Sequence, residues 1–443
     1  MARSKAELGY KEALARVYAL ERRGIKLGLK PLTRALTLLG SPERKLKFVH
    51  IAGTNGKGSV SAMVEASLRA AGYKTGLFTS PHLHRWTERV QLNGKPLSPA
   101  AATAVIHDVC DALERPGVPQ LSFFELGFAI AVEAFVRAKV DIVVLEAGLG
   151  GRLDATNIVT PELAVITNVG LDHTQYLGNT VAAIAREKAG IIKRGVPVLT
   201  AAEDARALKV IEARARAMKS KLAVLHRDFG GLAEAKTAAR GERVSLWTRK
   251  SLLGDVKLGL AGEHQHRNAA LAHATLVALR EGGWRIPDAA IRRGLARVRW
   301  PGRLERIAKG PDLWLDVAHN VDGVRALVRA LGAAPVQRKR VVIFGAMEDK
   351  AHDDMLRLLA PSASAFVFTR ASLARAASPR ALARVVPRRE VPGEVAANAA
   401  AALKVARKLA GPKGEIVCTG SLFLVAEVRA LVLGLDADPP IRM

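Results

Sequence analysis

Short, unbroken runs of apolar residues recur along the chain, and they alternate with longer segments whose apolar positions repeat at helical spacing. The runs cover residues 46–53, 74–80, 140–148 and 163–170, and the helical segments cover residues 57–72, 124–138, 179–193 and 267–283. A continuous apolar run is typical of a parallel strand that is buried on both faces. The pattern therefore predicts an α/β fold with a mainly parallel sheet and helices on both of its faces.

A second series of apolar runs follows a Pro-Gly break at residues 299–303, whose sequence is RWPGR. These runs cover residues 313–319, 340–347, 364–369 and 415–421. A break of this kind between two α/β series marks a domain boundary. We therefore predict a large N-terminal domain at residues 1–298 and a smaller, Rossmann-like α/β domain at residues 299–443.

Composition supports a globular protein rather than a disordered or membrane-spanning one. The 443 residues are 49% hydrophobic and 25% charged, which is enough apolar surface for two or three domains. No apolar run approaches the roughly 20 residues that a membrane span needs. The first 20 residues lack the order of a signal peptide, and Ser4 with Glu7 instead predicts a capped helix, so we expect a cytoplasmic protein.

Only two cysteines are present, Cys110 and Cys418, and they are far apart in the sequence. A disulfide framework or a cysteine-rich metal site requires more cysteines at closer, regular spacing. We therefore expect both thiols to be ordinary core residues.

The formal net charge of +27 would suit a protein that binds nucleic acid. The basic residues, however, are dispersed through helical segments such as residues 205–221 and 290–300, and aromatic residues make up only 5% of the chain. Few aromatic residues leave few surfaces on which bases could stack. The distribution favours an arginine-rich, solvated surface that attracts anionic ligands, and a basic nucleic-acid-binding NTPase remains an alternative.

The segment HIAGTNGKGSV, residues 50–60, connects a predicted strand to a predicted helix and contains three glycines and a lysine. Glycines at Gly53, Gly56 and Gly58 allow backbone N–H groups to surround phosphate oxygens, and Lys57 adds a mobile positive charge. Gly58 separates Lys57 from Ser59, whereas the common phosphate loop has Ser or Thr directly after its lysine. The segment still predicts a nucleotide-phosphate site.

Three further residues have chemistry that would complete such a site. Glu146 ends an apolar strand, His173 follows another one, and Lys188 lies in the helical segment 179–193. Each of these residues, taken alone, is more often structural than functional. Close to a phosphate loop, however, a carboxylate at the end of a strand is a natural ligand for Mg²⁺, which prefers oxygen.

Ten motifs in order along the chain resemble the folylpolyglutamate synthase/dihydrofolate synthase family, within the Mur ligase superfamily. They are GTNGKGS, FTSPHL, FFELG, LEAGLGGRLDATN, TNVGLDH, EKAGIIK, GEHQHRNA, WPGR, LDVAHN and VCTGSLFL. The resemblance implies an ATP-dependent ligase that adds L-glutamate through an acyl phosphate to dihydropteroate, to reduced folates or to both, with a bifunctional enzyme as the main expectation; the sequence does not distinguish these three substrate ranges. It also implies a monomer that acts on small molecules, without a nucleic-acid or membrane partner.

The resemblance also implies which residues bind ATP and metal. The expected ATP contacts are Gly53, Thr54, Asn55, Gly56, Lys57, Gly58, Ser59, Asn268, Arg303 and Asp316. Two Mg²⁺ ions are expected, with ligands from Ser80, Glu146, His173 and a carbamylated Lys188. Carbamylation would turn a cation beside the metal into an oxygen ligand. The residues expected to take part in catalysis are Lys57, His173, Lys188, Arg303 and His319.

For the pterin-bearing substrate, the resemblance points to three segments, whose residues are Gly28, Leu29 and Lys30; Ser122, Phe123, Phe124 and Glu125; and Leu153, Asp154 and Ala155. We add the hypothesis that His319 and Asn320 contact the incoming glutamate. The chain departs from the family pattern at Lys30, where relatives have an acidic residue, and at Ala351, which interrupts an Asp-Lys-Asp motif after Lys350.

Two other nucleotide-dependent functions are alternatives to a folate ligase. A cell-wall muramyl ligase shares the superfamily chemistry, but the FFE and FTSPHL spellings favour the folate branch. A GTPase switch would need an NKxD guanine motif, which the sequence lacks.

Overall fold

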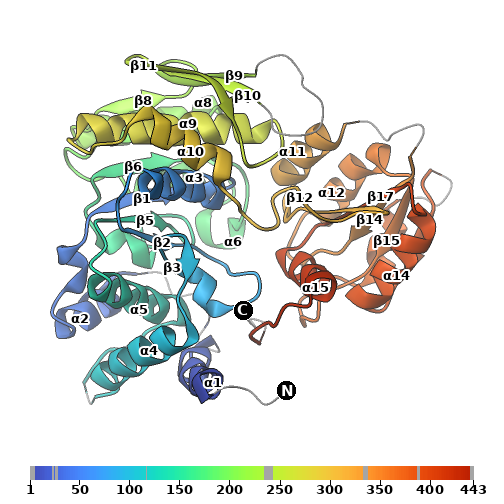
Figure 1. The fold of residues 1–443 in the computed structure, drawn as a ribbon, viewed down its shortest axis with the longest axis horizontal. Helices are drawn as coiled ribbons and strands as arrows, with labels where there is room; N and C mark the ends of the chain where they lie inside the picture. The colour runs from blue at the N-terminus through green and yellow to red at the C-terminus, as the bar shows by residue number, and fades with distance from the viewer. Residues whose placement is uncertain are drawn as a thin grey trace.

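The protein consists of two lobes, which lie on the left and right of Figure 1. The computed structural model describes residues 5–21, 24, 28–115, 117–233, 243–332, 338–386 and 390–439. The first lobe contains an eight-stranded and a three-stranded sheet, and the second contains a six-stranded sheet. The chain crosses from one lobe to the other between α10 (Asp288–Arg297) and β12 (Glu305–Ala308), as Figure 1 shows.

The eight-stranded sheet has the order β4-β3-β2-β5-β1-β6-β7-β8 and is parallel except at β3 and β4. Its strands are β1 (Phe48–Ala52), β2 (Thr75–Phe78), β3 (Val90–Leu92), β4 (Lys95–Pro96), β5 (Ile142–Glu146), β6 (Leu163–Ile166), β7 (Val198–Thr200) and β8 (Leu222–Val224). Strand β1 lies between β5 and β6, with Ile51 paired to Glu146 on one side and to Val165 on the other. The carboxyl end of β1 therefore opens beside Glu146.

Helices cover both faces of this sheet, as the unbroken apolar runs predicted. One face packs against α3, α9 and α10, and the other packs against α4 and α5 near β2 and against α7 and α8 near β6. The helices of the lobe are α1 (Lys5–Tyr18), α2 (Lys30–Leu38), α3 (Lys57–Ala70), α4 (Pro99–Leu113), α5 (Phe123–Arg137), α6 (Thr174–Leu177), α7 (Val181–Ala189), α8 (Ala205–Ala217), α9 (His264–Glu281) and α10 (Asp288–Arg297), with the 3-10 turns η2 (Pro42–Lys45), η3 (Trp86–Arg89) and η4 (Ala155–Ile158).

A small antiparallel sheet, which the apolar pattern did not predict, lies over α9 and α10 (Figure 1). Its strands are β9 (Phe229–Ala233), β10 (Arg243–Thr248) and β11 (Ser251–Lys257). Side chains from this sheet, including Leu246 and Leu253, join the core that α3 and α9 form with the main sheet. The sheet thus covers the outer side of α9, whose first turns face the phosphate loop.

The second lobe is a six-stranded sheet of order β12-β13-β17-β14-β15-β16, parallel except for β12. Helices α14 and α15 pack on one face, and α11, α12 and α13 pack on the other. The elements are β12 (Glu305–Ala308), β13 (Asp312–Leu315), β14 (Arg340–Phe344), β15 (Ala365–Phe368), β16 (Gly393–Val395), β17 (Glu415–Thr419), α11 (Val321–Leu331), α12 (His352–Leu359), η5 (Ala360–Ser362), α13 (Pro379–Val385), α14 (Ala399–Ala410) and α15 (Leu422–Leu433).

The α/β fold class with two lobes is confirmed. The placement of a domain boundary at residue 299 stays a prediction. Cys110 and Cys418 are buried free thiols, as expected. Ser4, the expected cap of the first helix, lies outside the described residues.

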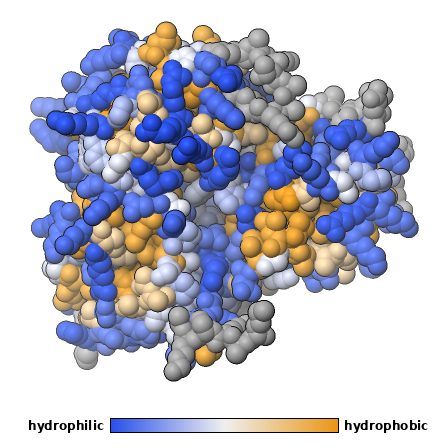
Figure 2. Space-filling model, viewed as in Figure 1, coloured by the Kyte–Doolittle hydropathy of each residue, from blue (hydrophilic) through white to orange (hydrophobic). Residues whose placement is uncertain are grey.

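The chain returns to the first lobe at its C-terminal end. The Asp438 carboxylate accepts hydrogen bonds from the Tyr10 hydroxyl and the Trp86 amide, each at 2.7 Å. The two lobes are thus joined both at residues 299–304 and by this tail. In the part of the chain that the structure describes, no helix has the length and apolar character of a membrane span. The face drawn in Figure 2 is largely hydrophilic, with hydrophobic areas on both lobes.

Candidate active site

The phosphate loop connects β1 to α3 and is held by the loop that follows β6. The Asn55 amide donates to the Asn168 side chain at 2.7 Å, and the Thr54 hydroxyl donates to the Gly170 carbonyl at 3.1 Å. The Lys57 ammonium donates to the carbonyl oxygens of Gly53 and Thr54, at 3.0 and 3.2 Å. With the lysine folded back on its own loop, the free backbone N–H groups at the start of α3 and the ammonium face the same space.

Gly58 is accounted for by a contact that the sequence did not predict. A Cβ atom at Gly58 would lie 2.8 Å from the Trp300 indole nitrogen, so the indole rests directly on the loop backbone. Only glycine leaves room for this contact. Trp300 belongs to the crossing between the lobes, and the unusual spelling of the loop therefore reflects the packing of the lobe junction on the phosphate site.

Glu146 is buried at the carboxyl end of β5, beside the start of the phosphate loop. Its Oε2 accepts a hydrogen bond of 3.3 Å from the Ser80 amide, and this is its one hydrogen bond among the described residues. Burial raises the pKa of Glu146, while the positive charges of Lys57 and Arg303 oppose that rise. A buried carboxylate with so little hydrogen bonding is short of a positively charged partner.

His173 and Lys188 reach the same cleft from the loop after β6 and from α7. His173 caps α6 with a left-handed φ of 49°. Burial, together with Lys350, His319 and Lys57, lowers its pKa to about 4, so the imidazole is neutral near pH 7. Burial and the charge of Lys57 lower the pKa of Lys188 to about 7. A substantial fraction of the Lys188 side chains is then uncharged near pH 7.

The second lobe contributes Arg303 and Asp316 to the cleft. Asp316 follows β13 and accepts hydrogen bonds from the amides of Leu304 and Ala318, both at 2.9 Å, so it fixes the turn that carries Arg303. Burial lowers the pKa of Arg303, and the charges of Asp316 and Glu146 oppose this effect. The guanidinium therefore lies within electrostatic reach of carboxylates from both lobes.

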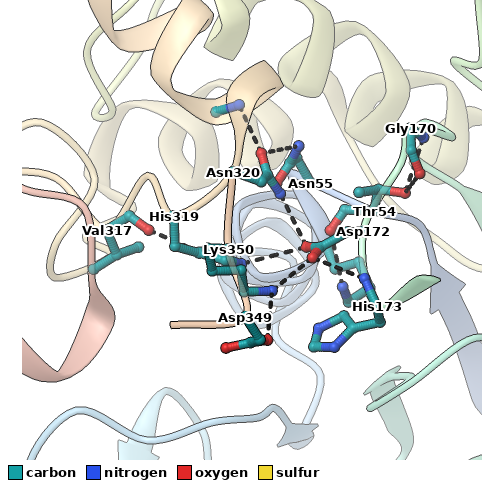
Figure 3. A network of polar contacts seen from close by, with 12 residues as sticks. Thr54, Asn55, Gly170, Asp172, His173, Val317, His319, Asn320, Asp349 and Lys350 are labelled. Carbon is teal, nitrogen blue, oxygen red and sulfur yellow. Dashed lines mark hydrogen bonds and ion pairs between the residues drawn. The ribbon is translucent and has the colours of Figure 1, made fainter. Parts of the chain in front are cut away.

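Figure 3 shows a polar network in which Asp172 of the first lobe joins residues of the second. The Asp172 carboxylate accepts hydrogen bonds from Lys350 at 2.6 Å and from the Asn320 side chain at 3.0 Å, and lies 3.6 Å from Nε2 of His319. Although burial opposes ionisation, His319 and Lys350 hold the pKa of Asp172 well below its ordinary range. Asn320 also exchanges hydrogen bonds with Asn55 of the phosphate loop, at 3.0 and 3.2 Å.

The wall expected to bind the pterin is built from α5 and the loop after β5. Ser122 and Glu125 form a capping box in which Oε2 of Glu125 accepts from both the amide and the hydroxyl of Ser122, at 2.8 and 2.7 Å. Phe123 is buried in the core beside Tyr18, whereas Phe124 is partly exposed to the cleft. Phe123 therefore has a structural role in the core, as is common for a buried aromatic side chain.

Asp154 also stabilises the loop after β5. It accepts hydrogen bonds from the amides of Leu149 and Thr156, at 2.7 and 3.0 Å, and so closes the loop after β5. Burial raises the pKa of Asp154, and these hydrogen bonds oppose the rise. The loop holds Leu153 and Ala155 at the cleft wall.

One cleft of about 2420 Å³ between the lobes collects most of the expected residues. Those that line it are Gly53, Thr54, Asn55, Gly56, Lys57, Gly58, Ser59, Ser80, Ser122, Phe123, Phe124, Glu125, Glu146, Leu153, Asp154, Ala155, His173, Lys188, Asn268, Arg303, Asp316, His319 and Asn320. Gly28, Leu29 and Lys30 do not line it, although the Gly28 amide donates to the Leu153 carbonyl at 3.2 Å.

Sequence reasoning missed four residues of the site: Trp300, Asp172, Lys350 as a partner of Asp172, and Arg89. Asp172 had a usable signal, because it directly precedes His173 in a loop after a buried strand. Lys350 was matched to a family motif, but no role was assigned to it. Trp300 stands in the WPGR motif, but no role was assigned to it. Arg89 had no local signal, since its position depends on packing between distant segments.

The fold and the cleft define an ATP-dependent ligase of the Mur type. Residues 51–276 match the Mur ligase middle domain, and residues 302–422 match the Mur ligase glutamate ligase domain. The chain belongs to the folylpolyglutamate synthase/dihydrofolate synthase family. It is 36% identical over 430 residues to the dihydrofolate synthase/folylpolyglutamate synthase of Bacillus subtilis, an alignment that covers 95% of this chain and 98% of the relative.

Solved structures of the same family have the same fold. Mycobacterium tuberculosis folylpolyglutamate synthase complexed with ADP superposes with a TM-score of 0.89 at 34% identity and covers 97% of this chain and 100% of that one. Escherichia coli FolC in complex with DHPP and ADP superposes with a TM-score of 0.86 at 30% identity, with coverages of 98% and 99%. These relatives support the folate family over the muramyl ligase and nucleic-acid alternatives.

Proposed function

We propose that this enzyme uses ATP to join L-glutamate to dihydropteroate and to reduced folates. The observation that carries the proposal is one cleft in which the phosphate loop, Glu146, His173 and Lys188 of one lobe face Arg303, His319 and Lys350 of the other. The names of the relatives support both substrates, since the Bacillus subtilis enzyme is named for both activities.

The reaction has two steps. A carboxylate oxygen of the pteroate or folate attacks the γ-phosphorus of ATP, the bond to the β-phosphate oxygen breaks, and an acyl phosphate and ADP result. The glutamate ammonium loses a proton, and the resulting amine attacks the acyl carbon. Phosphate leaves and takes up a second proton from this nitrogen as the amide forms. Lys57 and Arg303 would offset the charge that develops on the transferred phosphoryl group. Closure of the cleft would keep water from the acyl phosphate.

The residues of the cleft near the carboxyl ends of β5 and β6 fit a divalent cation. Glu146 supplies a buried carboxylate with one weak hydrogen bond, and the Ser80 hydroxyl and the neutral His173 imidazole line the same cleft. Oxygen-rich sites of this kind suit Mg²⁺. We propose that Ser80, Glu146 and His173 hold Mg²⁺, with a carbamylated Lys188 as a further ligand. When bound by these residues, Mg²⁺ would supply positive charge that offsets the negative charge of the phosphate groups.

The position of Lys188 supports the carbamate. Its side chain is 3% exposed and lines the cleft from α7, in a site that already contains the cation of Lys57. A second buried ammonium there would be unfavourable beside a divalent cation, whereas a carbamate is an anionic oxygen ligand. A carbamate forms from the uncharged amine, which the lowered pKa of Lys188 makes available.

His319 and Asn320 are proposed to lie next to the incoming glutamate. The His319 ring is fixed because Nδ1 donates to the Val317 carbonyl at 3.0 Å, which leaves Nε2 on the side of Asp172. Asn320 bridges Asp172 and the phosphate loop. An incoming glutamate would therefore meet fixed hydrogen-bonding side chains beside the site of phosphoryl transfer.

The test of the proposed function is ADP release with Mg²⁺ and L-glutamate in the presence of either 7,8-dihydropteroate or a reduced folate, with the product identified by mass. We expect turnover with both substrates and products heavier by one glutamyl residue. Removal of divalent cations with EDTA should abolish turnover, and added Mg²⁺ should restore it. Absence of glutamate-dependent ADP release with either substrate would refute the proposed function.

A further inference from the structure

Arg89 is a buried cation at the wall of the cleft to which the expected site gives no role. It is the last residue of η3, directly before β3, and its residue exposure is 3%. It nevertheless lines the cleft, together with Ser122, Phe123 and Glu146. An almost fully buried guanidinium at the wall of a substrate cleft needs an explanation, because burial of a charge is costly unless the charge is paired.

The protein uses only part of the hydrogen-bonding capacity of this guanidinium. Nε donates to Nδ1 of His82 at 2.9 Å, and the guanidinium carbon lies 5.2 Å from the centroid of the Phe123 ring. Neither of these partners is an anion, since Nδ1 of His82 accepts the hydrogen bond through its lone pair and Phe123 is apolar. Among the described residues, no carboxylate lies within 4.0 Å of Arg89, and Nη2 has no hydrogen-bond partner.

Another buried arginine of the chain, Arg340, also lines the cleft but is fully paired within the protein. Arg340 has the same 3% exposure, but its Nε donates to Glu415 at 2.6 Å and its two terminal nitrogens donate to three backbone carbonyls. Every nitrogen of Arg340 thus has an acceptor, and the charge has a counter-ion. Arg89 differs in both respects, although both residues are equally hidden from solvent.

The carboxylates of Glu21, Glu146 and Glu88 act on the charge of Arg89, but among the described residues each of them lies more than 4.0 Å from its guanidinium nitrogens. Glu88 accepts hydrogen bonds from the amides of Leu83, His84 and Arg85, at 2.8 to 2.9 Å. Oε2 of Glu125 accepts from Ser122. This part of the cleft therefore presents a cationic donor without a protein acceptor, which is complementary to an oxygen acceptor on a ligand.

We propose that Arg89 binds the first substrate, with its guanidinium donating a hydrogen bond to an oxygen of the pteroate portion. The guanidinium lies against the Phe123 ring, and both residues line the cleft. Pairing of this donor by the ligand removes the cost of leaving it unpaired. This assignment rests on the proposed function, because it takes a pteroate-containing molecule as the first substrate.

The test compares Arg89→Lys and Arg89→Met with the unchanged enzyme. Arg89→Lys keeps the positive charge and loses the planar donor group, whereas Arg89→Met removes both. Titration with pteroic acid in the absence of glutamate gives Kd, and steady-state assays give KM for each substrate. We expect Kd for pteroic acid, and KM for both dihydropteroate and a reduced folate, to rise roughly 10- to 100-fold in Arg89→Met. KM for ATP and for glutamate should change less than about twofold.

Arg137→Met is the matched control. Arg137 lies at the C-terminal end of α5, whereas Phe123 lies at its N-terminal end, and Arg137 forms ion pairs with Glu133 and Asp108 on the surface. It should leave every Kd and KM unchanged. Thermal unfolding of each variant separates loss of binding from loss of folding, and Arg89→Lys supplies the answer if Arg89→Met does not fold.

Three results would overturn the assignment. They are an unchanged Kd for pteroic acid in a folded Arg89 variant, an equal rise in KM for ATP and glutamate, and a rise in KM for reduced folate alone. The last result would place the bonded oxygen on the glutamyl portion that dihydropteroate lacks. Failure of the proposed function is distinguishable, since the unchanged enzyme would then show no glutamate-dependent ADP release, whereas pteroic acid binding tests Arg89 without turnover.

Discussion

Replacement of Asp172 by asparagine should loosen the contact between the two lobes. Asp172 follows β6, whereas its ion-pair partner Lys350 follows β14, so this pair spans the cleft (Figure 3). The substitution Asp172→Asn would keep the size of the side chain and remove its charge. Lys350 would then have only Asp349, at 4.0 Å, as an anionic neighbour among the described residues.

The magnitude follows from burial. The side chains of Asp172 and Lys350 are 9% and 11% exposed, and their charged atoms are 2.6 Å apart. A solvent-exposed pair contributes roughly 0–1 kcal/mol, whereas removing one partner of a buried pair costs about 3–5 kcal/mol. Because this pair is nearly but not fully buried, we expect Asp172→Asn to lower the free energy of unfolding by about 2–4 kcal/mol at pH 7.

The effect should depend on pH with a definite sign. The pKa of Asp172 is lowered in the folded protein, so the carboxylate stabilises the fold at every pH above its unfolded pKa of about 3.9. Stability from this residue is lost as the pH falls below that value. The difference between the Asp172→Asn variant and the unchanged protein should therefore be constant from about pH 6 to pH 8 and shrink below about pH 4.

The assay is urea unfolding of Asp172→Asn, Lys350→Met and the double variant. If the pair couples the lobes, the double variant should be less destabilised than the sum of the two single variants, by about 1–3 kcal/mol. Two probes, one in each lobe, should be followed, because a two-lobed protein need not unfold in one step. Additivity within about 0.5 kcal/mol would refute the conclusion that the two charges stabilise each other.

Three further predictions concern single sites. Gly58→Ala should destabilise the protein by about 1–3 kcal/mol and raise KM for ATP, because its methyl group would lie 2.8 Å from the Trp300 indole. Adding Trp300→Ala should relieve both effects, as measured by equilibrium unfolding and by steady-state kinetics. Lys188→Ala should lower kcat roughly 100-fold or more, with partial recovery when short carboxylic acids are added to the ADP-release assay; full activity without them would argue against a carbamate. Arg340→Met should cost about 3 kcal/mol in urea unfolding, because it leaves the buried Glu415 carboxylate unpaired, while kcat at a temperature well below unfolding should stay unchanged.

Local patterns in the sequence were sufficient for the elements and for much of the site. Unbroken apolar runs identified β1, β5 and β6 as strands covered on both faces, because a strand with helices on both sides cannot tolerate alternating polar residues. The glycines and lysine at residues 53–58 identified the phosphate loop, since close approach of a backbone to phosphate requires them. Glu146 was recognised from its place at the end of a strand.

Other features depended on residues far apart in the chain and could not be read from any window of the sequence. Asp172 and Lys350 are 178 positions apart, and nothing near either residue indicates that their charges meet across a cleft. The capping box of Ser122 and Glu125, by contrast, is a local Ser-x-x-Glu pattern, and the substrate contact expected at Glu125 stays a prediction. The unpaired donor of Arg89 became visible only when every neighbour was placed, because pairing in a folded interior is decided by tertiary packing rather than by the order of residues.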